Sequence, residues 1–362
     1  MSSPLQPEVE ALSERTLELC GIKSPIGSER DICDHVERWA SRHFEPSQRV
    51  RVSNSLVLGT FGDPRPTVAL VGHLDTVPAH TTDKPPRREG DRLFALGSSD
   101  MKGGIAVMMA LVERLDRKAL PFNVVLVLYE REEGPYLENG LGPVLERVPE
   151  LSRIKLGIAM EPTDNAVQVG CVGTLHAMLT FKGRSAHSAR PWQGENAIHK
   201  AGPLLAELLG RPRREVEFAG LSFFEVMSIT KANGGRARNV VPDDFQLNLN
   251  YRFAPGKSIE QAQEELRQFV NGRAEIEFTD LSPSGHVPKN NALYEQLLKT
   301  VGGVPEAKQA WTDVGRLSVH GIDAVNFGPG ETAQAHQANE SCSVAALGHA
   351  YEKLARFLTG QR

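Results

Sequence analysis

The chain has 362 residues, of which 40% are hydrophobic and 24% are charged, and its formal net charge is −4. This length is enough for two domains of ordinary size, and the slightly acidic balance argues against a general nucleic-acid or membrane-surface binder. The sequence has no run of about 18 or more apolar residues, no secretory segment after Met1 and four widely separated cysteines, so we expect a soluble, cytoplasmic protein with reduced thiols.

The first part of the chain alternates between helical and extended patterns. Apolar residues at helical spacing predict helices, and short apolar runs bounded by turn residues predict buried strands. Strand-helix-strand alternation of this kind predicts a doubly wound α/β sheet. The expected helices are 4–22, 28–43 and 105–117, and the expected strands are 49–59, 67–73 and the runs FNVVLVLY and IKLGIAM.

The middle of the chain has a different order of elements. From Gly173 to about Gly285 the pattern is strand, helix, strand, strand, helix, strand, which is the order of a ferredoxin-like α+β unit. A polar stretch at 281–288 is typical of a return linker, and the last helix is expected at 343–359. We therefore expect a discontinuous domain of residues 1–174 and 288–362, with an inserted domain of residues 175–287.

The stretch VALVGHLDTVP, residues 68–78, carries the first chemically notable pair. His73 and Asp75 are two residues apart at the end of an apolar strand, so their side chains project to the same side. Open α/β sheets bind their ligands at this end of the strands. Taken alone, the pair fits a metal ligand with its orienting carboxylate, half of a catalytic triad, or a polar turn.

More acidic and imidazole residues follow the later apolar runs in the same way. Each has a simple structural explanation, since adjacent glutamates are usually solvated and an aspartate before a helix is often a cap. Together they would repel one another unless a cation compensated them. Oxygen and imidazole groups without thiolates suit zinc or another first-row divalent metal, and two ions bridged by one carboxylate would satisfy the set. The residues are His73, Asp75, Asp100, Glu132, Glu133, Glu161 and His336.

Six motifs that span nearly the whole chain resemble, in the same order, those of the co-catalytic zinc aminoacylase and carboxypeptidase family. They are HLDTVP (73–78), GSSDMKGG (97–104), EREEG (130–134), MEPTD (160–164), AHSARPWQGENAI (186–198) and AHQANE (335–340). Within the family, four further motifs most resemble the succinyl-diaminopimelate desuccinylases of the actinobacterial type. These are GCVGT (170–174), NYRFAP (250–255), WTDVGR (311–316) and NFGPG (326–330).

The resemblance implies two Zn²⁺ ions per chain, with Co²⁺ or Mn²⁺ as possible substitutes. Asp100 would bridge the two ions, and the peptide bond after it would be cis. His73 and Glu161 would complete the protein ligands of one ion. Glu133 and His336 would complete those of the other.

The same resemblance implies which groups move protons. Asp75 would orient and polarise His73. Glu132 would act as the general base, taking a proton from water and delivering it to the leaving amine. His187, in the inserted domain, would donate to the oxyanion of the partner subunit's active site. From the residues alone, His187 also fits an ordinary turn histidine.

The inserted domain would then be a lid and the interface of a homodimer. Asn239, Arg252 and Gly328 would contact the substrate, and an arginine is suited to bidentate binding of a carboxylate. Arg252 also fits an exposed polar face of a strand. No nucleic-acid or membrane partner is expected.

The implied activity is the hydrolysis of a small N-acyl amino acid, namely removal of succinate from N-succinyl-LL-2,6-diaminopimelate. An acetylornithine deacetylase, an aminoacylase or a carboxypeptidase of the same family is the second possibility. Two departures from the family pattern are present. Arg131 replaces an aspartate that many relatives carry in EREEG, which affects the local charge balance. QVGCVGT lacks the basic residue that many desuccinylases carry after the MEPT motif, which bears on the substrate. A metal-free relative with only a binding role would be expected to lack a ligand or the base, and none is missing here.

Overall fold

The computed structural model describes residues 6–361, and the chain within it forms two compact units. The first unit comprises residues 6–170, His286–Lys308 and residues 312–361. The second unit comprises Cys171–Gly285 with the short segment Gln309–Trp311. Each unit is described separately below.

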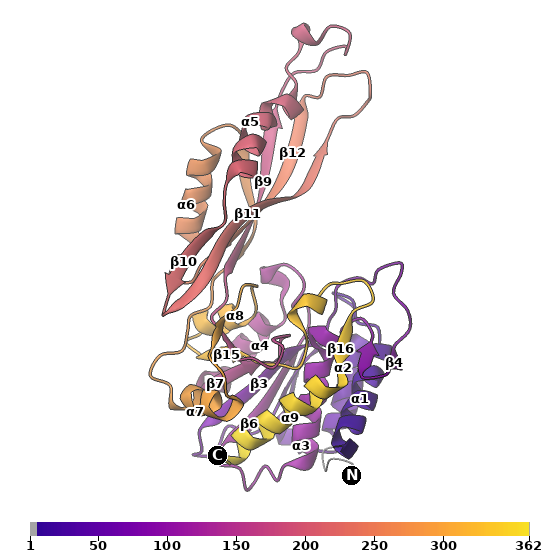
Figure 1. The fold of residues 1–362 in the computed structure, drawn as a ribbon, viewed down its shortest axis with the longest axis vertical. Helices are drawn as coiled ribbons and strands as arrows, with labels where there is room; N and C mark the ends of the chain where they lie inside the picture. The colour runs from indigo at the N-terminus through magenta and orange to yellow at the C-terminus, as the bar shows by residue number, and fades with distance from the viewer. Residues whose placement is uncertain (1–5, 362) are drawn as a thin grey trace. The chain divides into compact units, whose positions relative to one another are not determined.

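The first unit contains a large sheet, a small sheet and several helices (Figure 1). Its helices are α1 (Gln6–Gly21), α2 (Arg30–Ala40), α3 (Gly103–Arg114), α4 (Leu141–Arg147), α7 (Ala292–Val301), α8 (Val314–Val319) and α9 (Val344–Thr359). Its strands are β1 (Arg49–Val52), β2 (Ser55–Leu58), β3 (Thr67–His73), β4 (Arg87–Glu89), β5 (Arg92–Phe94), β6 (Asn123–Tyr129), β7 (Ile154–Ala159), β8 (Gln168–Val169), β14 (Glu306–Ala307), β15 (Ala324–Asn326) and β16 (Ser341–Ser343).

The large sheet has β3 near its centre. Among the described residues the strand order is β1-β2-β6-β3-β7-β15-β8-β14, and β3 runs parallel to both of its neighbours, β6 and β7. Every residue of β3 is buried, as expected for a parallel strand covered on both faces. The carboxyl ends of β3, β6 and β7 therefore meet at one edge of the sheet.

Two glycines show how helices cover both faces of this sheet. A Cβ at Gly72 in β3 would lie 2.5 Å from the side chain of Met101 and 3.4 Å from that of Met108 in α3. A Cβ at Gly157 in β7 would lie 3.3 Å from the side chain of Leu317 in α8. In the register of the two strands Gly157 pairs with Ala69, which points to the face opposite Gly72. The doubly wound α/β class predicted from the sequence is confirmed.

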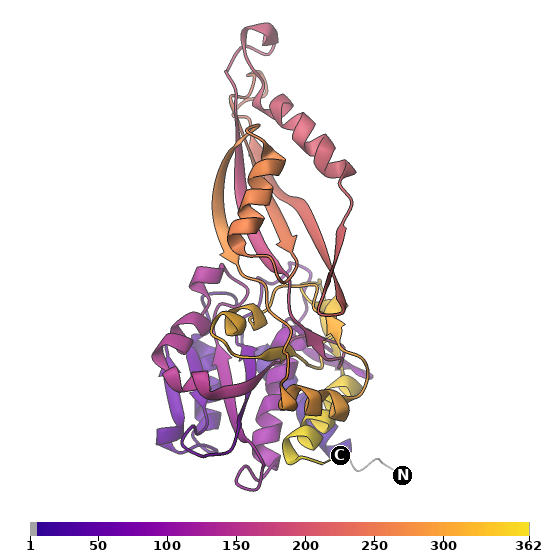
Figure 2. The same cartoon turned by 90° about the vertical axis from the view of Figure 1, so that its left-hand side faces the viewer.

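The second unit is an α+β layer. Its strands are β9 (Gly173–Lys182), β10 (Arg214–Phe218), β11 (Leu221–Gly234), β12 (Asp244–Phe253) and β13 (Glu275–Ser282), and its helices are α5 (Ala197–Gly210) and α6 (Ile259–Val270). The strands form one antiparallel sheet of order β10-β11-β12-β9-β13. Alternate residues of β9 pack against both helices, so α5 and α6 lie on the same face (Figures 1 and 2).

Two sequence-based expectations about the elements are wrong. The strand expected at 49–59 is a hairpin, because Ser53 takes a positive φ of 54° and turns β1 back along β2. The second unit has one strand more than expected, since β10 pairs with β11 through a turn at Ala219 and Gly220. Three of the five residues of β10 are exposed, and its apolar alternation covers just Val216 and Phe218, which is too short to mark a half-buried strand.

None of the helices within residues 6–361 combines the length and the apolar character needed to cross a bilayer.

Candidate metal centre

Three neighbouring parallel strands deliver acidic and imidazole residues to one edge of the large sheet. His73 is the last residue of β3, Glu132 and Glu133 follow the end of β6, and Glu161 follows the end of β7. Because β3 pairs with both other strands in parallel, all these positions lie at the same carboxyl edge. Each of these residues therefore lies at the edge because it ends an apolar strand or follows one within a few residues.

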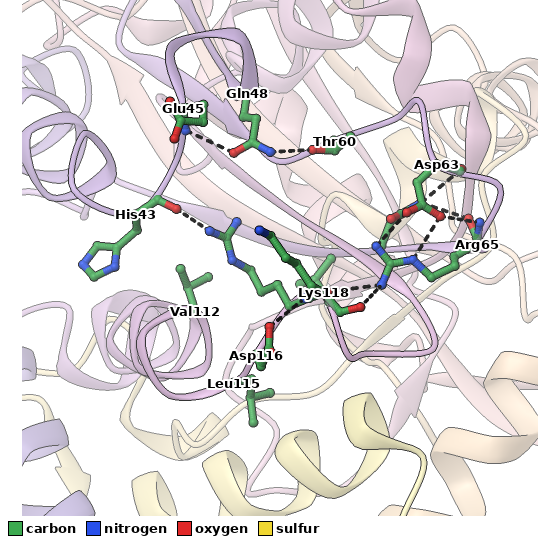
Figure 3. Close-up of a pocket in the computed structure, with 13 residues that line it drawn as sticks. His43, Glu45, Gln48, Thr60, Asp63, Arg65, Val112, Leu115, Asp116 and Lys118 are labelled. Atoms are coloured by element: carbon green, nitrogen blue, oxygen red, sulfur yellow. Dashed lines mark hydrogen bonds and ion pairs between the residues drawn. The ribbon is translucent and has the colours of Figure 1, made fainter.

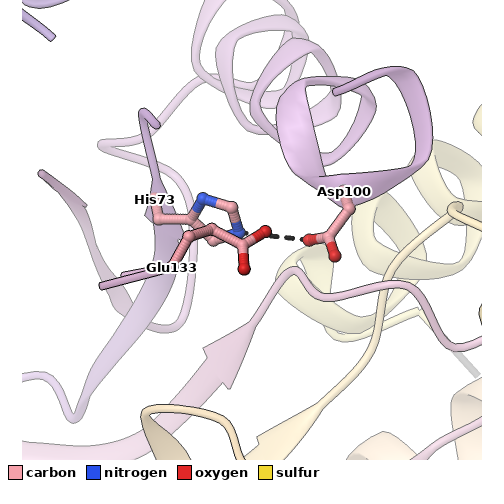
Figure 4. Close-up of side chains that lie close together, drawn as sticks. All are labelled: His73, Asp100 and Glu133. Atoms are coloured by element: carbon pink, nitrogen blue, oxygen red, sulfur yellow. Dashed lines mark hydrogen bonds and ion pairs between the residues drawn. The ribbon is translucent and has the colours of Figure 1, made fainter. Parts of the chain in front are cut away.

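Asp100 reaches this edge from the turn that precedes α3. Its Oδ1 lies 3.1 Å from Nε2 of His73, and one ligand atom from each of His73, Asp100 and Glu133 lies within 4.8 Å of the others. Figure 4 shows these three side chains pointing toward one another. The peptide bond between Asp100 and Met101 is cis, as expected.

His336 approaches the same group from the segment before β16. Its Nε2 lies 2.9 Å from Oε1 of Glu133 and 3.6 Å from Oδ2 of Asp100. The His336 side chain is about half exposed, whereas those of Glu133 and Asp100 are nearly buried. Asp100 thus has one carboxylate oxygen directed to His73 and the other to His336.

Asp75 ties the histidine to the acidic turn. Its two carboxylate oxygens each accept a backbone N–H at 3.0 Å, one from Glu132 and the other from Glu133. Nδ1 of His73 lies 3.1 Å from the backbone oxygen and 3.5 Å from the carboxylate of Asp75. Burial opposes the ionisation of Asp75, but the hydrogen bond and charge of His73 outweigh it and lower the pKa of Asp75.

The glutamates at this edge are crowded by other carboxylates. Burial, with the added charge of Glu161, holds the pKa of Glu132 well above its ordinary value. Burial and the charge of Asp100 raise the pKa of Glu161 to about 7, and they also raise the pKa of Glu133. Carboxylates packed this closely out of water need a cation to stay ionised together. The donor set of carboxylate oxygens and imidazole nitrogens therefore fits a site for divalent metal.

Comparison with known proteins agrees with this chemistry. A model of the peptidase family M20/M25/M40 matches residues 69–360. The chain belongs to peptidase family M20/M25/M40. Membership makes it a metal-dependent amide hydrolase, as the sequence motifs predict.

The relatives of this M20/M25/M40 member include desuccinylases and a deacetylase. A Mycobacterium tuberculosis protein with the provisional name succinyl-diaminopimelate desuccinylase DapE is 36% identical to this chain. The match covers 96% of this chain and 98% of that protein. This chain is 34% identical to the succinyl-diaminopimelate desuccinylase of Corynebacterium glutamicum, with 96% of each chain covered. Acetylornithine deacetylase of Myxococcus xanthus is 30% identical over 84% of this chain and 83% of that one.

A solved structure supports the fold. A tripeptidase from Staphylococcus aureus superposes with a TM-score of 0.78 at 18% identity, covering 98% of both chains.

Gly328 lies beside the end of β7 in this family member. A Cβ there would overlap the backbone oxygen of Met160 and lie 2.5 Å from that of Glu161. The backbone N–H of Gly328 donates to Oγ1 of Thr163 at 3.0 Å. The absence of a side chain at Gly328 therefore allows its backbone to contact the backbone of Met160 and of Glu161, a candidate metal ligand.

The remaining predicted site residues belong to the second unit. His187 and Asn239 are exposed and sit on adjoining segments, where Ser188 N–H donates to the Asn239 backbone oxygen at 3.0 Å. Nδ1 of His187 accepts the N–H of Ala189 at 3.1 Å. Arg252 is a partly exposed residue of β12 whose Nε donates to Oδ1 of Asn250 at 3.0 Å. These three residues belong to the second unit, whereas the five candidate metal ligands belong to the first unit.

One buried acid at the metal centre was not identified from the sequence as a site residue. Glu340 lies four residues after His336, and its carboxylate accepts backbone N–H groups from the turn that carries Asp100. The motif AHQANE contains both residues, so the presence of Glu340 in this motif was the one sequence feature that could have identified it as a site residue. Its partners lie about 240 positions earlier, and sequence spacing gives no hint of that contact.

A separate cavity of about 460 Å³ lies near the start of β6, at the edge of the sheet opposite the metal centre. Figure 3 shows its polar lining, in which Gln48 accepts from Glu45 N–H and donates to Thr60. Asp63 and Arg65 pair at 2.8 Å on another wall. None of the residues proposed for metal or substrate binding lines this cavity.

Proposed function

We propose that the protein is a dinuclear zinc amidohydrolase that hydrolyses N-succinyl-LL-2,6-diaminopimelate to succinate and LL-2,6-diaminopimelate. This reaction serves lysine and diaminopimelate biosynthesis, and we place it in the cytoplasm, where four buried free cysteines stay reduced. The observation that carries the proposal is the buried cluster of His73, Asp100 and Glu133 at the end of three parallel strands. The similarity to desuccinylases over 96% of the chain supports the choice of substrate.

Five side chains would hold the metals. Asp100 lies between His73 and His336, which suits a bridging carboxylate. His73 and Glu161 would complete one set of ligands, and Glu133 and His336 the other. Zinc fits the mixed oxygen and nitrogen donors, with Co²⁺ or Mn²⁺ as substitutes. Bound divalent cations supply Lewis acidity, which polarises the amide carbonyl and lowers the pKa of water.

Glu132 would move the proton in this reaction. Its backbone N–H is fixed by Asp75, and its carboxyl group is buried beside Glu161. Next to cations it would be ionised and able to accept a proton from the attacking water. The same group would then protonate the amide nitrogen of diaminopimelate as the C–N bond breaks.

The second unit would supply substrate contacts and the dimer interface. The exposed His187 would donate a hydrogen bond to the oxyanion in the partner's active site, and Asn239 and Arg252 would contact the substrate together with Gly328 of the first unit. The partly exposed guanidinium of Arg252 is suited to a substrate carboxylate. The chain would thus work as a homodimer that acts on a small N-acyl amino acid.

An acetylornithine deacetylase, or an aminoacylase or carboxypeptidase of the same family, is the second candidate. The 30% identity to the Myxococcus xanthus enzyme supports a deacetylase as one form of this second candidate.

An assay of the purified zinc-loaded protein separates the candidates. We expect kcat/KM for N-succinyl-LL-2,6-diaminopimelate to exceed that for acetylornithine and for simple dipeptides by at least about 100-fold, because a site built to hydrogen-bond a polar group can reject analogues that lack it by about 10⁴-fold. The Glu132→Gln variant, prepared in the same way, controls for contaminating hydrolases. If acetylornithine is hydrolysed faster than N-succinyl-LL-2,6-diaminopimelate, the protein is the second candidate, an acetylornithine deacetylase.

A further inference from the structure

We propose that Glu340 is a positioning residue, which holds the main chain of Asp100 in place and so sets the spacing between Asp100 and His336. The inference rests on the proposed metal site and adds to it a residue that touches neither metal nor substrate. It explains how two candidate ligands from distant parts of the chain, Asp100 and His336, are held at a fixed distance from each other.

The carboxylate of Glu340 is bound by three backbone N–H groups of one turn. Oε1 accepts from Ser99 at 2.7 Å and from Asp100 at 2.9 Å, and Oε2 accepts from Gly97 at 2.8 Å. The side chain is nearly completely buried, with the residue 2% exposed. Successive N–H groups that point into one concavity form an anion-binding nest, and here the protein's own carboxylate fills it.

The shape of the turn depends on Gly97. Its φ is +82°, and a Cβ there would lie 2.9 Å from the side chain of Thr76. With this conformation the N–H of Gly97 and those of Ser99 and Asp100 converge on one acceptor. A buried carboxylate satisfies all three donors at once, which a neutral side chain with one acceptor oxygen cannot do.

Glu340 belongs to the same short segment as His336. The segment takes positive φ at both His336 (61°) and Asn339 (56°), so it turns twice between the histidine and the glutamate. It is also tied to the Asp100 turn by two neighbouring contacts: Ala95 N–H donates to the Glu340 backbone oxygen at 3.0 Å, and Ser99 Oγ donates to the Ser341 backbone oxygen at 3.1 Å.

Loss of the carboxylate would act on the metal site through this contact. The three N–H groups would be left buried without their acceptor, and the turn would shift to find water or another partner. Asp100, whose own N–H is one of the three, would move relative to His336, from which its Oδ2 lies 3.6 Å away. Groups that orient metal ligands typically change metal affinity by about 10- to 100-fold when they are removed.

The test compares Glu340→Ala and Glu340→Gln with wild type in the full-length protein. Alanine removes both acceptor oxygens, whereas glutamine keeps one and sets an NH₂ group against the backbone donors. Glu225→Gln is the matched control, because Glu225 is equally buried and accepts the backbone N–H of Ala254 at 2.9 Å, but lies in the second unit. Zn²⁺ affinity is measured by competition with a chelator, and amide hydrogen exchange is followed over residues 97–100.

We expect Glu340→Ala to lower Zn²⁺ affinity by about 10- to 100-fold, and Glu340→Gln by a smaller factor. Exchange at 97–100 should accelerate in both variants, with or without zinc, while Glu225→Gln changes neither measurement. If Glu340→Ala does not fold, the milder glutamine variant decides.

Wild-type affinity and exchange in a folded Glu340 variant would overturn the proposal, and so would an equal loss of zinc affinity in Glu225→Gln. A wild-type protein that binds no zinc would instead refute the proposed function, whereas the exchange measurement would still report on the Glu340 contact.

Discussion

At the scale of single residues, Asp75 has two functions that follow from one carboxylate. It faces Nδ1 of His73 and also accepts the N–H groups of Glu132 and Glu133. The sequence predicts the first contact, because residues two apart on a strand share a side. The second contact joins the ends of β3 and β6 and depends on their pairing, so it became visible only in the fold.

We expect Asp75→Asn to lower both kcat and zinc affinity by about 10- to 100-fold. The carboxylate of Asp75 contacts the N–H of Glu132, the N–H of Glu133 and the imidazole of His73. The NH₂ group of asparagine is a donor and cannot accept from these groups, so one of the three contacts is lost. Asp63→Asn is the control, since Asp63 also accepts a backbone N–H but is a surface partner of Arg65. Steady-state kinetics and chelator competition on both variants check this, and equal behaviour of the two would contradict it.

Glu132→Gln should leave zinc binding intact and lower kcat by at least about 100-fold, the usual contribution of a general base. Glutamine keeps the volume of the side chain but cannot accept the proton of water. Metal content and kcat are measured on the same preparation. Turnover near that of wild type in a fully loaded variant would remove Glu132 from the mechanism.

The cysteines should be inert in the folded protein. All four are buried, and burial raises the pKa of Cys20 and of Cys33 to about 12. At pH 8 the thiolate fraction of such a group is about 1,000-fold smaller than that of a thiol with the ordinary value near 9. We expect a thiol reagent to modify all four cysteines in urea, but hardly any in native buffer. Fast native modification would show that the core around them opens.

At the scale of elements, the sequence predicted the strands that are apolar and buried, but it did not predict the exposed strand β10. The buried strand β3 is recognisable because its residues are apolar almost without interruption, and the same holds for β6 and β7. The strand β10 was missed because its residues are mostly exposed and its pairing with β11 depends on a two-residue turn. Periodicity reports burial, so it cannot detect a strand that buries little.

That turn gives a prediction about stability. Ala219 has a φ of 52°, a left-handed conformation that costs an alanine free energy, and Gly220 follows with a φ of 78°. Asparagine tolerates this region, and Asn-Gly is a preferred pair in two-residue hairpins. We expect Ala219→Asn to raise the free energy of unfolding by about 0.5–1 kcal/mol, as measured by urea denaturation. Ala232→Asn, within β11, is the control and should not stabilise the protein.

At the scale of the whole molecule, the division into two units was expected from the change in element order near Gly173. The roles proposed for the second unit are harder to obtain from sequence, because they require knowing where a second chain lies. The ring of His187 accepts the N–H of the nearby Ala189, and its backbone pairs with Val240. These contacts within one chain neither support nor oppose the proposed role of His187 in a second subunit.

Mixing two inactive variants tests the role of His187 between subunits. If His187 serves the partner's site, a dimer of one His187→Ala chain and one Glu132→Gln chain has one complete site. Random exchange of subunits should then restore about a quarter of wild-type activity, as expected for a twofold dimer. If each chain uses its own His187, the mixture stays inactive. Light scattering on each variant establishes that dimers are present.

The chain enters and leaves the second unit at neighbouring points, since Gly285 N–H donates to the Cys171 backbone oxygen at 3.0 Å in an isolated antiparallel bridge. For the first unit, the long insertion is therefore a loop whose ends are already closed, and closure entropy grows only slowly with loop length. The same position would accept a shorter turn or a different module at little thermodynamic cost. This junction gives evolution, or a protein engineer, a place to exchange the second unit while the large sheet of the first unit is retained.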